Sequence, residues 1–108
     1  MEIFGEIFGK DLKTISEYKS ADYFWKKEKA DDNNHIYLYR AYEGDERKNF
    51  CEMLIGKKFI NPDKSVSFIR PKAEDWGKYA WTLWGTDEQI EKRWQEKCRF
   101  SLFPEGQI

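Results

Sequence analysis

Three residues of this chain carry side chains that could form a nucleophilic or metal-binding centre: Cys51, Cys98 and the single histidine, His35. A histidine can activate a cysteine thiol, and the two residues need to meet only in space. Zinc sites use the same residue types, but neither cysteine lies at ligand spacing from the histidine. The histidine follows a polar turn and is expected to be exposed. The pattern therefore favours neither a catalytic centre nor a metal site.

The chain also lacks the short motifs of the common enzyme classes. It contains no phosphate-binding glycine loop, no serine-hydrolase elbow and no zinc-protease helix motif. We therefore predict that the protein is not an enzyme and binds no cofactor. An enzyme built on His35 or on one of the cysteines is the least favoured of three hypotheses.

Acidic residues occur in adjacent pairs, a pattern that could serve general acid–base chemistry. The pairs are Asp31/Asp32, Asp45/Glu46, Glu74/Asp75 and Asp87/Glu88. All of them lie at predicted turns or helix starts, where carboxylates cap backbone N–H groups and keep the chain soluble. If the fold gathers several of these loops, their negative charge would form an interface for a basic partner. We therefore favour capping and partner binding over catalysis.

The chain has five tryptophans, and most of them are expected in the core. Trp76 is the exception, because it lies in a loop flanked by acids, a proline and a glycine, where we predict an exposed indole. Tryptophan is enriched among the residues that dominate binding energy at protein interfaces. The predicted partner-binding residues are Glu43, Asp45, Glu46, Glu74, Asp75 and Trp76. The carboxylates would face basic residues of the partner, and the indole would insert as an apolar anchor.

A second candidate surface combines basic and aromatic residues on two neighbouring predicted strands. Its members are Lys57, Lys58, Phe59, Val66, Phe68 and Arg70. Stacking and charge together can hold single-stranded nucleic acid in this way. The chain lacks the fuller RNA-recognition pattern of glycines and spaced rings. A small nucleic-acid-binding or phage-type regulatory module is therefore the alternative function.

The composition predicts a single globular domain over residues 1–108 with a charged shell and an aromatic-rich interior. The 19 basic and 20 acidic residues nearly cancel, which argues against a histone-like binder of nucleic acid. Aromatic residues make up 18% of the chain, far more than disordered segments carry. Each large ring can bury roughly 150–250 Å², so a few of them build a core in a short chain.

Targeting signals are absent from the sequence as given. No apolar run approaches the ~20 residues that span a bilayer, and acids stand where a secretory signal needs basic residues. The cytoplasm is therefore the expected location, with no membrane association. In a reducing compartment the two cysteines are expected as small, unpaired thiols.

Helical periodicity predicts two helices in the first half of the chain. Apolar residues recur near one face between residues 2 and 19, although two glycines weaken that pattern. Phe50, Met53 and Leu54 form an i, i+3, i+4 stripe that ends before Gly56, a natural helix stop. A second helix is therefore expected to open near the acids that precede this stripe.

The clearest local signal predicts a third helix over 87–98. Thr86 and Gln89 match a capping box, in which each side chain bonds the free backbone N–H of the other residue. Acids follow in the first turns and basic residues in the later ones, as the helix dipole favours. Ile90 and Trp94 begin a narrow inward stripe along this helix.

Strands are expected where aromatic and β-branched residues lie between turn signals. They are predicted on either side of turns at 31–34 and 61–64, over 79–84, and near residues 100–103. Short turns between consecutive strands produce antiparallel hairpins. We therefore predict an α+β fold: an antiparallel sheet of about four to five strands with two to three helices packed mainly on one face.

The overall character of the chain resembles the small immunity proteins of bacterial toxin systems, including contact-dependent growth inhibition. The resemblance rests on the start MEIFGEIFGKDLK, the length near a hundred residues, and the acid–aromatic loops EGDE and AEDWG. Those proteins share no common fold, so no binding residue is carried over from them. The near-neutral net charge of -1 departs from their strongly acidic members.

This resemblance implies a cytosolic bacterial protein that neutralises a cognate toxin domain. The toxin is usually a nuclease, and its basic active-site cleft is covered by acidic and aromatic side chains. We therefore predict a non-catalytic, protein-binding inhibitor of the immunity type.

Overall fold

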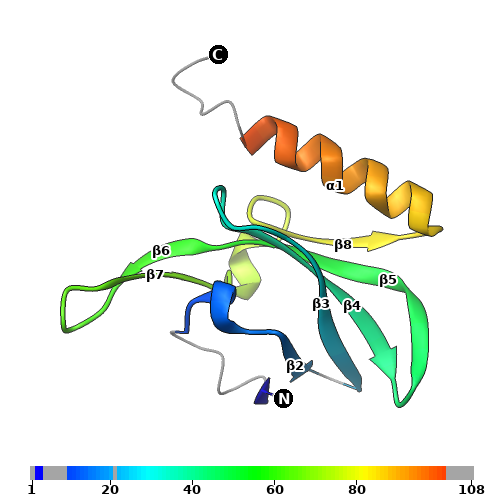
Figure 1. The fold of residues 1–108 in the computed structure, drawn as a ribbon, viewed down its shortest axis with the longest axis horizontal. Helices are drawn as coiled ribbons and strands as arrows, with labels where there is room; N and C mark the ends of the chain where they lie inside the picture. The colour runs from blue at the N-terminus through cyan, green and yellow to red at the C-terminus, as the bar shows by residue number, and fades with distance from the viewer. Residues whose placement is uncertain (1, 4–9, 21, 102–108) are drawn as a thin grey trace.

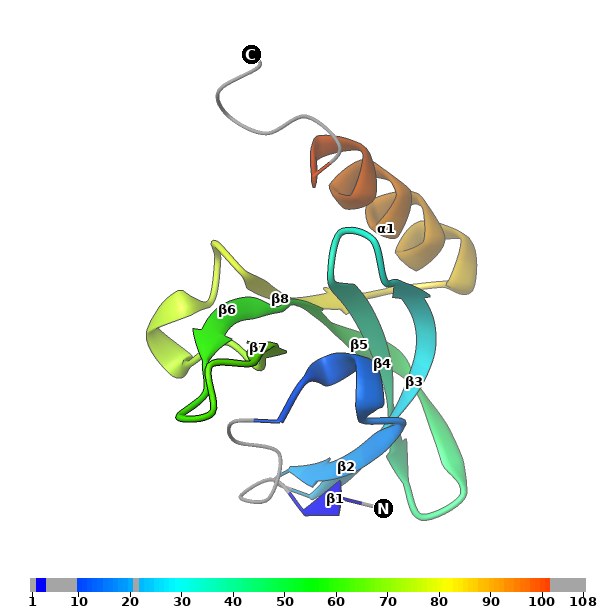
Figure 2. The ribbon, with the colours of Figure 1, turned by 60° about the vertical axis from the view of Figure 1, so that its left-hand side comes forward.

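The computed structural model describes residues 2–3, 10–20 and 22–101, and these residues form mainly β-strands (Figures 1 and 2). Most strands belong to a six-stranded sheet with the order β1-β2-β3-β4-β5-β8. Its strands are β1 (Glu2–Ile3), β2 (Glu17–Ser20), β3 (Tyr23–Asp31), β4 (Ile36–Glu43), β5 (Glu46–Ile55) and β8 (Ala80–Trp84). Neighbouring strands run antiparallel, except that β1 and β2 are parallel.

The remaining elements lie around this sheet. They are the antiparallel strands β6 (Lys57–Ile60) and β7 (Val66–Ile69), the 3-10 turns η2 (Leu12–Thr14) and η3 (Ala73–Asp75), and the helix α1 (Asp87–Ser101). Helix α1 covers one face of the sheet and η2 lies against the other (Figure 1). None of the described helices is long and apolar enough to cross a membrane.

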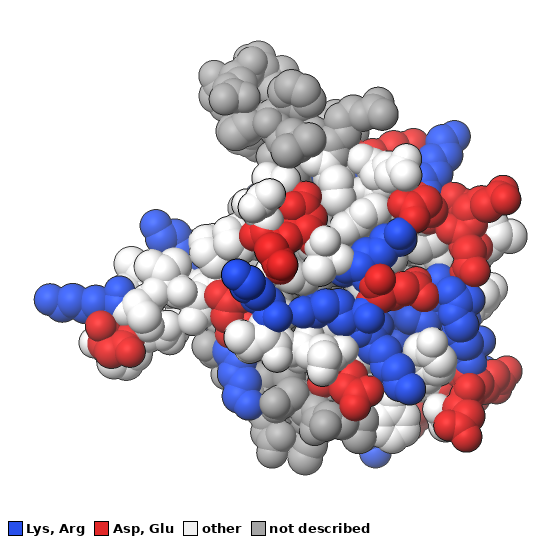
Figure 3. Space-filling model, viewed as in Figure 1, with Lys and Arg blue, Asp and Glu red and all other residues white. Residues whose placement is uncertain are grey.

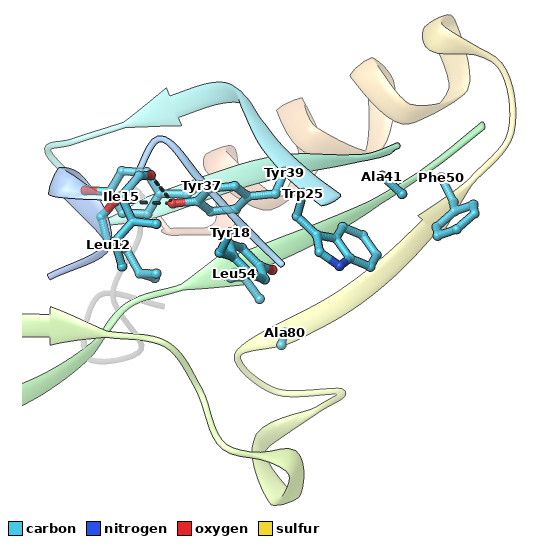
Figure 4. Close-up of a cluster of buried hydrophobic side chains, with 10 residues drawn as sticks. All are labelled: Leu12, Ile15, Tyr18, Trp25, Tyr37, Tyr39, Ala41, Phe50, Leu54 and Ala80. Carbon is cyan, nitrogen blue, oxygen red and sulfur yellow. Dashed lines mark hydrogen bonds between the residues drawn. The ribbon is translucent and has the colours of Figure 1, made fainter. Parts of the chain in front are cut away.

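Strand β4 lies inside the sheet and is buried on both faces. Successive side chains of a strand point to opposite faces, so each face of the sheet has its own core. On the η2 side, Tyr37 and Tyr39 join a cluster that is largely aromatic (Figure 4), and the Tyr39 hydroxyl donates to the Ile15 carbonyl over 2.7 Å. On the α1 side, Ile36 and Leu38 join a second, mainly aliphatic cluster. Side chains of this one strand therefore contribute to the packing on both faces of the sheet, against η2 on one side and against α1 on the other.

Helix α1 is held to the sheet by apolar packing and by an ion cluster at its first residue. Ile90 and Trp94 contribute to the second core. At the start of the helix, the guanidinium of Arg40, only 1% exposed, donates to Glu28 over 2.9 Å and to Asp87 over 3.1 Å. Arg47 contacts the same two carboxylates. Burial alone would raise the pKa of Glu28, but the hydrogen bonds from the two arginines hold it below its usual range.

The predicted α+β fold is wrong in the number and placement of its helices. The described residues contain one α-helix and two 3-10 turns instead of two to three helices on one face, and the sheet has six strands instead of four to five. Of the helix predicted over 2–19, residues 4–9 lie outside the described residues. The described remainder contains β1, η2 and β2. The helix predicted around Phe50 is strand β5.

The local signals that depend on neighbouring residues are confirmed. The helix predicted over 87–98 is α1, three residues longer at its end, and its capping box is present: Thr86 N–H donates to Gln89 over 2.8 Å and Gln89 N–H donates back over 3.2 Å. The turns at 31–34 and 61–64 connect β3 to β4 and β6 to β7. The strand predicted over 79–84 is β8, whereas of the last predicted strand Phe100 lies in α1 and residues 102–103 lie outside the described residues.

Candidate protein-interaction sites

The turn between β4 and β5 presents three of the predicted carboxylates to solvent; we call it the acidic tip (Glu43, Asp45, Glu46). Glu43 and Glu46 form the last residue pair of the hairpin, and their side chains are 57% and 68% exposed. Lys48 bridges these two carboxylates at 3.1 and 3.2 Å, and the bonds to Glu43 and Glu46 raise the pKa of its ammonium group. One lysine against three acids leaves the tip negatively charged.

The second predicted acid loop, around η3, is used mainly by the fold itself. Asp75 is 8% exposed; it accepts a hydrogen bond from Lys72 N–H over 3.0 Å and contacts the ammonium of Lys57 at 3.1 Å. These two interactions hold the pKa of Asp75 below its usual range. Trp76 is partly buried and packs against the first core, so the prediction of an exposed indole is wrong at this position. Glu74 is exposed.

The six predicted partner-binding residues do not form one surface. The acidic tip and the η3 loop lie at opposite ends of strand β5, since Glu46 begins the strand and Lys57, the ion-pair partner of Asp75, follows its end. A ten-residue strand spans about 30 Å, and Figure 2 shows the two loops on opposite sides of the molecule. Of the six predicted residues, the acidic tip and Glu74 present exposed carboxylates, and their role in binding stays a prediction.

The hairpin formed by β6 and β7, here called the arm (residues 57–69), carries large apolar side chains in solvent. It projects from the body of the protein (Figure 1), and Figure 3 shows charged groups of both signs near its end. Phe59 is 41% exposed, Ile60 64% and Val66 46%, and the last two form a cross-strand pair. Exposed apolar side chains grouped in this way are typical of interaction sites.

Half of the predicted basic–aromatic set on this hairpin is already engaged. Phe68 stacks on His35 with ring centroids 3.4 Å apart, which makes the histidine partly buried rather than exposed. Arg70 is buried beside Glu52 at 3.2 Å, and Lys57 is paired with Asp75. The remaining members, Lys58, Phe59 and Val66, are exposed. The structure thus leaves a group of exposed apolar side chains on the arm, with Lys58 beside them, instead of a basic stacking platform.

A groove between the end of β8 and the side of α1 next to it was not predicted from the sequence. It has a volume of about 450 Å³ and is lined by Trp84, Gln89, Lys92, Arg93, Glu96 and Lys97. The indole of Trp84 is 60% exposed and stacks on Phe50 with centroids 4.3 Å apart. The helical lining residues recur at i, i+3, i+4, i+7 and i+8, which places them on one side of a helix. That spacing, beside a tryptophan at a strand end, is the signal by which the groove could have been found.

The two cysteines lie where α1 meets the sheet: Cys51 is buried, and Cys98, a residue of α1, is partly buried. Cys51 and Cys98 both belong to or pack against the second core, and both are unpaired. Burial raises the pKa of the Cys51 thiol to about 12 and that of the Cys98 thiol to about 11. Cys51 pairs with Arg40 on β4, whereas His35 immediately precedes β4. Arg40 is five residues beyond His35, a separation of about 16 Å in extended chain. A Cys51–His35 nucleophile pair is therefore contradicted by the geometry.

The raised pKa values predict slow thiol chemistry in the folded protein. At pH 8 we expect both cysteines to react with a disulfide reagent about a hundredfold more slowly than in urea, because the thiolate is the reacting species. The rate should climb as the pH rises toward 11, where the deprotonated fraction grows. A pH–rate profile measured with and without urea checks this, and a native thiol that reacts as fast as an unfolded one would contradict it.

The comparisons with known proteins add no relative to this description: no family model, no curated protein and no solved structure matches the chain. Among the described residues, no group of three or more His, Cys, Asp or Glu side chains is arranged to hold a metal ion. The class is therefore defined by the fold and its surfaces. Within the described residues it is a mainly β protein with one docked helix, an arm that exposes apolar side chains, an acidic tip, and a groove lined by three cations and one carboxylate.

Proposed function

We propose that this protein is a non-catalytic inhibitor of the immunity type, which neutralises a cognate toxin domain by binding to it. The observation that supports this proposal best is the apolar arm. Its three exposed large apolar side chains, Phe59, Ile60 and Val66, lie on strands of only four residues. Two-stranded ribbons are marginally stable in isolation, so leaving their apolar side chains in water favours a binding role over a structural one.

The free energy available from burying the apolar side chains of the arm is large enough to anchor an interface. Fully burying a large apolar side chain contributes roughly 1.5–3 kcal/mol, and these three are already partly covered, so together they offer several kcal/mol to a partner. The arm alone is smaller than the ~800 Å² that each side of a typical stable complex buries. We therefore expect the partner to contact neighbouring surfaces as well, with the acidic tip attracting basic residues at long range.

The test uses the protein encoded by the reading frame next to this one in its genome, which is the expected toxin. Calorimetric titration of the two purified proteins is expected to give a tight complex. Replacing Ile60 and Val66 together with serine should weaken it by about a hundredfold, through the loss of buried apolar contact. Tyr79→Ser is the matched control: Tyr79 is 39% exposed but outside the arm, and its removal should change the affinity little.

The possible outcomes test two statements separately: that the protein has the immunity-type function, and that the arm is the surface that contacts the toxin. If the neighbouring protein is not bound at micromolar concentration, the immunity-type function is contradicted. If it is bound but the Ile60→Ser/Val66→Ser variant binds equally well, the function stands and the arm is not the contact. Circular dichroism of each variant shows whether the fold is retained.

A further inference from the structure

We propose that the groove between β8 and α1 is a second binding site, which takes an extended acidic segment of another protein as an added strand on the edge of β8. This site is separate from the arm and does not depend on the proposed function. Three features of the described residues support it: the open edge of β8, cations of α1 that lack ion-pair partners, and the exposed residue Trp84 at the end of that edge.

Strand β8 is the last strand of the described sheet, so one of its edges is unpaired. The hydrogen bonds from Ile55 N–H to Tyr79 and from Gly85 N–H to Asn49 fix which residues point toward β5. In an antiparallel pair these alternate with residues that point away, so Thr82 and Trp84 direct their backbone N–H and C=O outward. The start of the strand is covered, because Ala80 C=O accepts a bond from Gly77 N–H. The open stretch is therefore short and begins at Thr82.

The side of α1 next to this edge is positively charged. Lys92 and Arg93 are exposed and have no ion pair within the described part of the chain. The ammonium of Lys97 lies 4.2 Å from the ring centroid of Trp81 rather than beside a carboxylate. Glu96 is the single acid in the lining. Three cations against one carboxylate favour an anionic ligand.

The spacing of these cations matches that of an added strand. Alternate residues of a strand project on the same side about 6.8 Å apart. Arg93 and Lys97 are four residues apart on the helix, a rise of about 6 Å, and α1 runs back along β8 (Figure 1). Carboxylates at alternate positions of an added strand would therefore meet successive cations. Trp84 pairs with Phe50 of the first core, so its ring lies on the face of the sheet away from α1. The side chains of the added strand that point to that face would cover part of this exposed ring.

A peptide fits this groove better than single-stranded nucleic acid. The open edge offers backbone donors and acceptors in alternation, which a peptide backbone complements and a phosphate backbone does not. Glu96 stands among the cations, where a continuous row of phosphates would be repelled. The groove also has one exposed ring, whereas nucleic-acid platforms stack several bases in succession. We therefore assign the site to an extended peptide with acidic residues at every second position.

The test measures peptide binding to the full ¹⁵N-labelled chain at low salt by NMR. The probe is the blocked heptapeptide Thr-Glu-Val-Glu-Val-Glu-Thr, and the comparison peptide has the same composition with its three glutamates adjacent. We expect the alternating peptide to shift the amide signals of Thr82 and Trp84 and to bind about tenfold more tightly than the comparison peptide, because only it matches the cation spacing.

Two variants separate the strand edge from the charge. Thr82→Pro removes an outward N–H and should weaken binding about tenfold through the lost hydrogen bond and the blocked edge, since proline is tolerated on edge strands. Lys92→Glu/Lys97→Glu should weaken it at least tenfold by charge reversal. The matched control, Lys58→Glu/Lys64→Glu, makes the same change in net charge on the arm and should leave the affinity within about twofold.

Three results would overturn the proposal: equal binding of the two peptides, binding that Lys92→Glu/Lys97→Glu does not reduce, or tighter binding of hexathymidylate than of the alternating peptide. The last result would assign the groove to nucleic acid. If Thr82→Pro unfolds, the charge variants and the two peptides still decide. None of these outcomes bears on the arm, so this inference and the proposed function fail independently.

Discussion

Replacing Arg70 with methionine is expected to lower the free energy of unfolding by about 3–5 kcal/mol, because it leaves a buried carboxylate without its counter-charge. Arg70 is 8% exposed and Glu52 7%, and their charged groups lie 3.2 Å apart in the first core. The Tyr18 hydroxyl donates to the same carboxylate. Burial, followed by the charge of Glu52, raises the pKa of Tyr18 well above its usual value. The tyrosine therefore stays neutral and keeps its hydrogen bond to Glu52, but it supplies no positive charge in place of the guanidinium.

Urea unfolding followed by tryptophan fluorescence measures this effect. The double variant Arg70→Met/Glu52→Leu should recover much of the loss, since removing both partners of a buried pair is often nearly neutral. Arg47→Met is the matched control, because Arg47 is 43% exposed in its ion pairs and should contribute no more than about 1 kcal/mol. A double variant as unstable as Arg70→Met alone would show that lost packing, and not the isolated charge, is the cause.

Replacing Trp94 with alanine is expected to cost about 3–5 kcal/mol, the usual range for removing a large core side chain. Trp94 is 8% exposed and belongs to the cluster through which α1 packs on the sheet. A cavity at this position would weaken the docking of the helix, because Ile90 is the other buried apolar side chain among the described side chains of α1. The capping box and the ion cluster would remain at the first turn and would hold only the start of α1.

Thermal or urea unfolding gives the stability change, and amide hydrogen exchange shows where it acts. In the Trp94→Ala variant the later turns of α1 should exchange faster than the strands of the sheet. Trp84→Ala is the matched control: this indole is 60% exposed, and its loss should cost no more than about 1 kcal/mol. Equal losses in the two variants would contradict the assignment of Trp94 as the main anchor of the helix.

Strand β5 shows why helical periodicity failed in this chain. Phe50 and Leu54 face the first core and Met53 faces the second, so both sides of the strand are apolar. The alternation that marks a half-buried strand is then lost, and three apolar residues at i, i+3 and i+4 imitate a helix. Helix α1 and the turns at 31–34 and 61–64 were predictable because their signals lie within a few residues of one another, whereas the acids of the turn at 43–46 are typical of a helix start as well.

The candidate sites were predictable to a smaller extent, because exposure depends on residues that are distant in sequence. The acidic tip is a tight turn, and its exposed carboxylates follow from local chemistry. Asp75 and Trp76 looked equally exposed, but Lys57 pairs with the first and the first core covers the second. The groove beside Trp84 depends on how α1 packs against β8, which no local pattern describes.

The buried position of Cys51 has a practical consequence. Because Cys51 is buried under the helix, a labelling reagent reaches it only when α1 separates from the sheet, whereas Cys98 is partly exposed. The rate at which the Cys51 thiol is modified therefore reports this local opening. The fluorescence of the five tryptophans reports global unfolding separately. A ligand that contacts both α1 and β8 should reduce this modification rate. Binding in the groove can therefore be measured without changing the sequence of the protein.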